Sequence, residues 1–165
     1  MLPGDAWMKS EKWKNYGYWT LFAEAAGAMS GWLSREGAQA FSETAAQPPL
    51  SPPAILFPII WTVLYLLMGI GAARVSQTVP SSERSKGLNL FVFQLVVNFF
   101  WSLIFFNAQA YGFAFLWLIL LWLLVLRMIL TFRKTDSLAA RLQIPYLLWL
   151  TFAAYLNAGV WYLNQ

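Results

Sequence analysis

The stretch from Pro48 to Gly71, PPLSPPAILFPIIWTVLYLLMGIG, decides how this chain is organised. Its first part predicts a stiff loop, because prolines fix the backbone φ angle and remove hydrogen-bond donors. These prolines are Pro48, Pro49, Pro52 and Pro53. Its second part carries no charge and predicts a membrane helix, with Pro58 tolerated near the first turn. Trp61, Tyr65 and Met68 recur on one face of this helix, so we expect a rigid lid leading to one wall of a site.

The composition predicts a membrane protein with several spans. The 165 residues are 59% hydrophobic, 18% aromatic and 11% charged. A soluble domain carries roughly 25% charged residues, so this chain has far too few. The long apolar stretches therefore indicate an all-α bundle within a bilayer.

The residue inventory excludes several kinds of chemistry. The chain has no Cys and no His. Thiol nucleophiles, Ser-His-Asp triads and zinc hydrolysis are therefore excluded. The seven acidic residues are scattered, so we expect no metal site. The net charge of +4 reflects Lys and Arg in loops, and we expect no nucleic-acid partner.

Five spans are expected, forming one domain over residues 1–165. Their approximate ranges are 16–33, 54–75, 88–108, 113–131 and 144–163. Residues 1–15 are interpreted as a short polar tail, and residues 34–53 as a long loop. The connection at residues 109–112 is very short, so the spans on either side of it should be antiparallel neighbours.

The charge distribution predicts the orientation in the membrane. Ten of the eleven Lys and Arg residues fall on the side of the N-terminus, and only Arg35 falls on the other. Basic loops remain in the cytoplasm. We therefore expect a cytoplasmic N-terminus and an external C-terminus, in a bacterial cell membrane.

Polar and aromatic residues within the spans mark candidate sites. The aromatic face around Trp61 could pack against another helix or line a ligand site. Asn98 and Ser102 lie at i and i+4, and either could form an interhelical hydrogen bond or contact a ligand. The last span carries indole, methyl and amide groups at steps of four, which suits a hydrophobic-ligand pocket. These residues are Trp149, Ala153, Asn157 and Trp161, of which Trp161, near the membrane surface, is interpreted as an interfacial belt residue.

Glu24 interrupts the first span. An ionisable residue in a span is a functional candidate by default. Proton coupling in a transporter is one interpretation. The alternative is that the span begins later or that Glu24 faces a watery cavity mouth.

Three segments together resemble a known family. They are PPLSPPAILFPIIWTVLYLLMG, QLVVNFFWSLIFF and IPYLLWLTFAAYLNAGVWYLN. In this order and spacing they are similar to the tryptophan-rich sensory protein and translocator protein family, also called the peripheral benzodiazepine receptor family. One departure stands out, since members often carry a Trp-Tyr pair in the first loop where this chain has Phe41 and Ser42.

The resemblance implies a five-helix membrane bundle, often a homodimer, whose pocket is closed by the first loop. It implies binding of porphyrins such as protoporphyrin IX, and of isoquinoline and benzodiazepine ligands. Some members degrade protoporphyrin in light, and Trp61 and Trp149 match the pocket tryptophans tied to that activity. The other matching pocket positions are Pro52, Pro53, Tyr65, Asn98, Ser102 and Ala153.

Two functions remain as alternatives. In the first, the porphyrin absorbs the light itself, no further cofactor is required, and Trp61 and Trp149 assist its degradation. In the second, the protein is a non-enzymatic transporter or stress regulator for tetrapyrroles or other hydrophobic ligands. A homodimer is expected in either case. Its interface could use Gly27 and Gly31 of the first span, or the small residues of the second, Gly69, Ala72 and Ala73.

Overall fold

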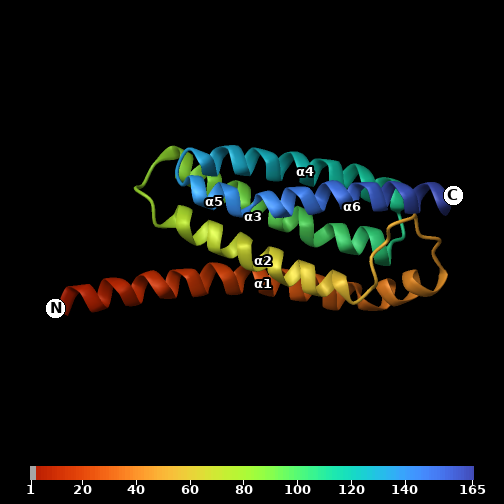
Figure 1. Ribbon diagram of the computed structural model, residues 1–165, viewed down its shortest axis with the longest axis horizontal. Helices are drawn as coiled ribbons and strands as arrows, with labels where there is room; N and C mark the ends of the chain where they lie inside the picture. The colour runs from red at the N-terminus through yellow and green to blue at the C-terminus, as the bar shows by residue number, and fades with distance from the viewer. Residues whose placement is uncertain (1–2) are drawn as a thin grey trace.

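Five long helices run lengthwise through the bundle, as Figure 1 shows for a computed structural model that describes residues 3–165. In chain order the elements are α1 (Pro3–Thr44), α2 (Leu56–Ser76), α3 (Ser82–Ser102), the π-helix η1 (Leu103–Asn107), α4 (Tyr111–Arg133), α5 (Ser137–Leu142) and α6 (Ile144–Leu163). The prediction of an all-α membrane bundle with five long helices is confirmed.

Within the described residues 3–165, three segments are long and apolar enough to cross a membrane: Leu56–Ser76, Ser82–Asn107 and Tyr111–Arg133. The other two long helices, the polar α1 and the uncharged α6, lie alongside them (Figure 1). The two described ends of the chain lie at opposite ends of the bundle. We call the end with the α2–α3 and α4–α5 turns the basic end. The opposite end, with the loop from Ala45 to Ile55, is the loop end.

The first helix is much longer than predicted. Residues 1–15 were expected to form a tail and residues 34–53 a loop, yet α1 runs from Pro3 to Thr44. Residues 1 and 2 of the predicted tail lie outside the described residues. The segment Ser34–Thr44 is rich in Ala, Glu and Gln, which favour a helix, and no proline interrupts it. The true loop therefore begins only at Ala45, just before the prolines.

An aromatic cluster holds the extra length of α1 in place at the loop end. Phe41 lies edge-on to Phe105 and Phe106 of η1, with ring centroids 5.2 and 5.5 Å away, and packs on Tyr111 at 6.2 Å. The Asn107 amide donates to the Leu33 carbonyl at 3.0 Å. These contacts explain why Phe41 belongs to the helix and not to the loop.

The proline loop is fastened to the last helix. The Asn164 amide exchanges two hydrogen bonds with the backbone of Ala46, at 2.8 and 2.9 Å. The Tyr155 hydroxyl donates to the Pro49 carbonyl at 2.8 Å. The prediction of a stiff loop over one end of the bundle fits these contacts, and Leu50 supplies its left-handed turn with φ of 67°.

Small residues let α1 and α2 pack closely inside the chain. Gly69 faces the α1 backbone, and a Cβ there would lie 2.5 Å from the Thr20 Cα. Ala72 and Ala73 are fully buried, and Gly27 is covered by the Tyr65 ring. Of the small residues considered for a dimer interface, these four are thus used within one chain. Gly31 alone has open space where a side chain would be.

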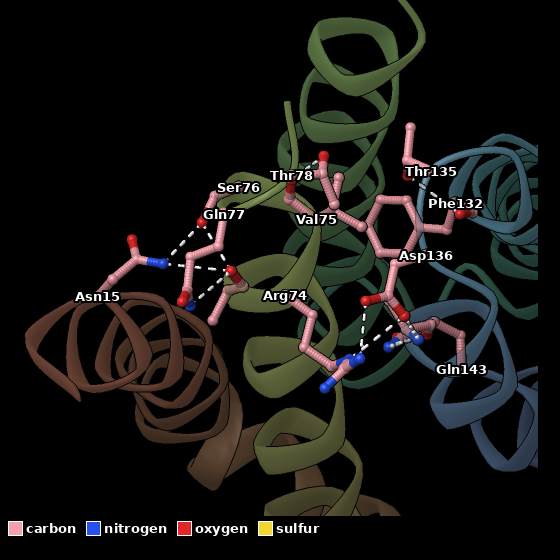
Figure 2. A network of polar contacts seen from close by, with 12 residues as sticks. Asn15, Arg74, Val75, Ser76, Gln77, Thr78, Phe132, Thr135, Asp136 and Gln143 are labelled. Atoms are coloured by element: carbon pink, nitrogen blue, oxygen red, sulfur yellow. Dashed lines mark hydrogen bonds and ion pairs between the residues drawn. The ribbon is translucent and has the colours of Figure 1, made fainter. Parts of the chain in front are cut away.

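A polar network closes the basic end (Figure 2). The Arg74 guanidinium of α2 contacts both carboxylate oxygens of Asp136, at 3.2 and 2.8 Å. Asp136 also caps α5 by accepting from the Ala139 backbone N–H at 2.8 Å. The Gln143 amide donates to the Leu67 carbonyl at 3.1 Å. The start of α5 and the start of α6 are therefore both tied to α2.

Candidate functional site

A chain of hydrogen bonds crosses the middle of the bundle. The Tyr65 hydroxyl donates to Asn98 Oδ1 at 2.9 Å, and Asn98 Nδ2 donates to the Tyr146 hydroxyl at 2.6 Å. Tyr146 in turn donates to Gln94 Oε1 at 2.9 Å. All four side chains are buried. We call this set the midplane chain. It joins α2, α3 and α6 with no formal charge, which suits a water-poor environment.

The indole of Trp61 packs against both tyrosines of the midplane chain. Its ring centroid is 5.5 Å from that of Tyr65 and 6.2 Å from that of Tyr146, the latter edge-on. Trp61 and Tyr65 are one turn apart on α2, as the sequence predicted. Met68, the third residue of that face, is buried beneath Gln94, whose amide approaches its sulfur at 3.7 Å.

Trp149 occupies the same side of the bundle, nearer the loop end. Its ring meets Phe57 of α2 at 5.9 Å and Phe152 of its own helix at 5.6 Å. Its indole N–H is buried and has no hydrogen-bond partner among the described residues. Ala153, one turn further on, is buried in the same core.

Aromatic rings thus connect α2 to α6 at two successive levels. Phe57 meets Trp149, and Trp61 meets Tyr146. We call this line of rings the aromatic seam. The backbone of α2 packs instead against α1, α3 and α5. Large side chains therefore fill the space between α2 and α6, and such rings can move aside or stack on a flat ligand more readily than packed backbones can.

The remaining predicted site residues lie apart from the midplane chain. Ser102 is half-buried at the end of α3, where the helix changes to η1. Pro52 is half-buried and Pro53 exposed in the loop. Asn157 does not share the site: its amide accepts from the Trp101 indole at 3.2 Å and donates to the Tyr111 carbonyl at 2.9 Å.

Two members of the midplane chain were missed in the sequence. Tyr146 lies one turn before Trp149, and Gln94 one turn before Asn98. The spacing of Gln94 and Asn98 was a usable signal, since two amides on one face of an apolar helix need shared partners. No cluster of acidic residues that could hold a metal occurs among the described residues, and the ligand-binding roles of the predicted residues stay predictions.

Comparison with known proteins shows which family this chain is similar to. Residues 19–163 match the TspO/MBR family. Protein CrtK of Rhodobacter capsulatus is 39% identical over 126 residues, covering 76% of this chain and 79% of that protein. Tryptophan-rich protein TspO of Chlorobaculum tepidum is 37% identical, over 73% of this chain and 77% of its own length. The translocator protein of Ovis aries is 36% identical, over 72% of each chain. The match covers all five long helices at least in part, and the chain belongs to the TspO/MBR family.

Proposed function

We propose that this membrane protein binds porphyrins such as protoporphyrin IX at the aromatic seam, and that it also accepts other flat hydrophobic molecules, including benzodiazepine-like ligands. The observation that carries the proposal is the pair of indoles on facing helices, Trp61 and Trp149, each packed on another ring. Porphyrins offer a broad π-surface that stacks well on such rings. An apolar wall with few polar groups is the usual lining of a small-molecule site.

The polar groups of the seam suggest how a porphyrin would be oriented. In the midplane chain, the Tyr65 and Tyr146 hydroxyls and both the oxygen and the nitrogen of the Asn98 amide already form hydrogen bonds within the protein. The buried Trp149 N–H, by contrast, has no acceptor among the described residues. A propionate or carbonyl oxygen of the ligand would satisfy that donor, and a buried donor without a partner is costly. The proline loop, held by Tyr155 and Asn164, would limit the access of water.

Light-dependent degradation of the bound porphyrin is part of the proposal. The porphyrin is the chromophore, and the protein supplies binding and containment. The excited porphyrin reacts with molecular oxygen, and Trp61 and Trp149 take part as stacking partners in the one-electron or singlet-oxygen steps. No thiol or imidazole is present in the sequence to act as a conventional acid, base or nucleophile.

The decisive assay illuminates purified protein with protoporphyrin IX and follows the loss of porphyrin absorbance. Wild type should consume the porphyrin faster than free porphyrin is lost, and Trp61→Phe and Trp149→Phe should each slow the reaction. Trp32→Phe is the matched control, since Trp32 is 62% exposed on α1, away from the seam. Degradation at the wild-type rate in both seam variants would contradict the mechanism.

The second candidate function is transport or regulation without catalysis. Glu24 favours it, because this carboxylate lies one turn from Gly27, which contacts Tyr65, and it has no ion-pair partner among the described residues. A stress regulator would bind tetrapyrroles saturably without forming products. A proton-coupled transporter would move them into vesicles in a pH-dependent way. Unchanged uptake by Glu24→Gln would rule out coupling through this residue.

We further propose that the N-terminus and the basic end face the cytoplasm of a bacterial cell and that two copies form a homodimer. The observation behind the orientation is that ten of eleven Lys and Arg residues belong to helices and turns at the basic end. Because the chain has no cysteine, Ser10→Cys and Gln47→Cys provide clean probes for a membrane-impermeant maleimide. In intact cells only the second should react. Mass measurement in a mild detergent tests the dimer.

A further inference from the structure

A shallow groove on α3 opens outward at the basic end, away from the aromatic seam. Its volume is about 560 Å³, and its lining comes from one face of this helix. The lining residues are Ser82, Ser85, Lys86, Asn89, Leu90 and Phe93. The opposite face of α3, which includes Phe91, Gln94 and Asn98, is buried in the bundle. The groove therefore faces outward from the bundle.

The lining residues change from polar to apolar along the helix axis. Two hydroxyls and an ammonium group come first, the Asn89 amide follows one turn later, and then come Leu90 and Phe93. The exposed apolar face continues with Val96 and Phe100. One helical turn advances about 5.4 Å, so these groups descend from the headgroup level into the hydrocarbon in the order in which a phospholipid presents phosphate, glycerol esters and acyl chain.

The charge of Lys86 is available to an external partner. Lys86 forms no ion pair with any residue in the part of the chain that the structure describes. The acidic neighbour on the same helix, Glu83, contacts Lys134 of α4 at 3.2 Å. Arg84 is directed elsewhere, donating to the Thr78 carbonyl at 3.1 Å. At the groove, therefore, the positive charge is not balanced by a paired carboxylate.

We propose that this groove binds the headgroup of an anionic glycerophospholipid from the leaflet at the basic end. Its phosphate lies against Lys86 and the hydroxyls of Ser82 and Ser85, and its acyl chain follows Leu90 and Phe93. Charge complementarity selects this occupant over a second copy of the chain. A two-fold axis along the membrane normal would bring the two copies of Lys86 to the same depth and close together, with like charges opposed.

The test titrates the detergent-purified protein with phosphatidylglycerol and with phosphatidylcholine of identical acyl chains, and counts bound lipid by native mass spectrometry. Wild type should prefer phosphatidylglycerol. Lys86→Gln should lose about fivefold of that preference, which is the effect of one surface Lys on an anionic lipid. Lys86→Arg should restore it. Lys9→Gln, which removes one charge from the exposed part of α1, should leave the preference unchanged.

Three results would overturn the proposal. Equal losses in Lys86→Gln and Lys9→Gln would mean that only the overall charge matters. Competition by soluble glycerol phosphate as effective as that by the lipid would mean that a free phosphate, not a lipid, is the ligand. A shift in the monomer–dimer equilibrium caused by Lys86→Gln, with lipid preference unchanged, would assign this face to a second copy. Porphyrin binding serves as the folding control, because the aromatic seam lies on other faces of the bundle.

Discussion

The middle of the bundle and its basic end both contain polar networks, yet they are built from different groups. The midplane chain consists of two tyrosines and two amides, all neutral and buried. The basic end uses an ion pair whose side chains are 31% exposed for Arg74 and 16% for Asp136. Of these two networks, only the one at the basic end carries formal charge, at a level where water and lipid headgroups can solvate it.

This difference follows from the cost of burying charge. In hydrocarbon an ion is expensive, and neutral donors and acceptors must find partners within the protein. Near the surface an ion pair is solvated, and its contribution is modest. The midplane chain should therefore depend on exact fit between helices, and the basic end on charge state and pH.

The largest expected effect comes from crowding the midplane chain at Gly27. A methyl group in Gly27→Ala would collide with the Tyr65 ring and push its hydroxyl away from Asn98. Overpacking of this kind costs about 2 to 3 kcal/mol. Unfolding of the detergent-solubilised protein by increasing SDS would measure it.

Gly31→Ala is the matched control, one turn along the same helix. Its added methyl meets nothing within 4 Å, so stability should be unchanged or slightly raised by the better helix propensity of Ala. Equal destabilisation by both substitutions would show that α1 needs glycine for another reason than close packing on Tyr65.

Removing Asp136 tests the basic end. Asp136→Ala loses the cap of α5 and the partner of Arg74, which together should cost about 1.5 to 2 kcal/mol. The thermal unfolding midpoint in detergent would report it. Glu83→Ala breaks the more exposed pair with Lys134 and should change stability by no more than about 0.5 kcal/mol. Equal effects of the two substitutions would show that the cap and ion pair of Asp136 stabilise the protein no more than the exposed pair of Glu83 does.

A smaller effect is expected when the midplane chain loses a link without crowding. Asn98→Leu removes two hydrogen bonds and should cost about 1 kcal/mol, because interhelical hydrogen bonds in membranes average about 0.6 kcal/mol. A double-mutant cycle with Tyr65→Phe isolates the Tyr65–Asn98 term. Fully additive effects would mean that this hydrogen bond contributes nothing to stability.

The sequence predicted the middle of the bundle better than its ends. Periodicity and missing charge mark spans directly, and Tyr65 and Asn98 do meet as polar residues in apolar helices must. The pairing of Trp61 with Tyr146 was not predicted, because it depends on how α2 and α6 are rotated about their axes. The pattern within one helix does not reveal that rotation.

The ends depend on contacts between residues far apart in sequence. Arg74 and Asp136 are separated by 62 residues, and the sequence around each residue does not identify the other as its partner. The length of α1 was underestimated for the same reason, since Phe41 is held by Phe105, Phe106 and Tyr111. Its helix-forming residues gave a local hint, and the contacts decided the outcome.

The finest distinction between the two networks is their response to pH. Burial raises the pKa of the Asp136 carboxyl, but the Ala139 N–H and the Arg74 guanidinium lower it by more, so the pKa lies below its ordinary value. A depressed pKa stabilises the folded protein above the unfolded-state value of about 3.9. That stability is lost as pH falls through the lower, folded-state value.

Asp136→Asn isolates this contribution, because Asn still caps a helix but does not titrate. The difference in unfolding midpoint between wild type and Asp136→Asn should be constant from pH 7 to about 5, and should shrink below about pH 4. The corresponding difference for Asn98→Leu should change less over this range, since none of the four side chains of the midplane chain is a carboxylate. A difference for Asp136→Asn that begins to shrink near pH 6 would place the titrating group elsewhere. The ion pair, and with it the contrast between the two networks, would then need another explanation.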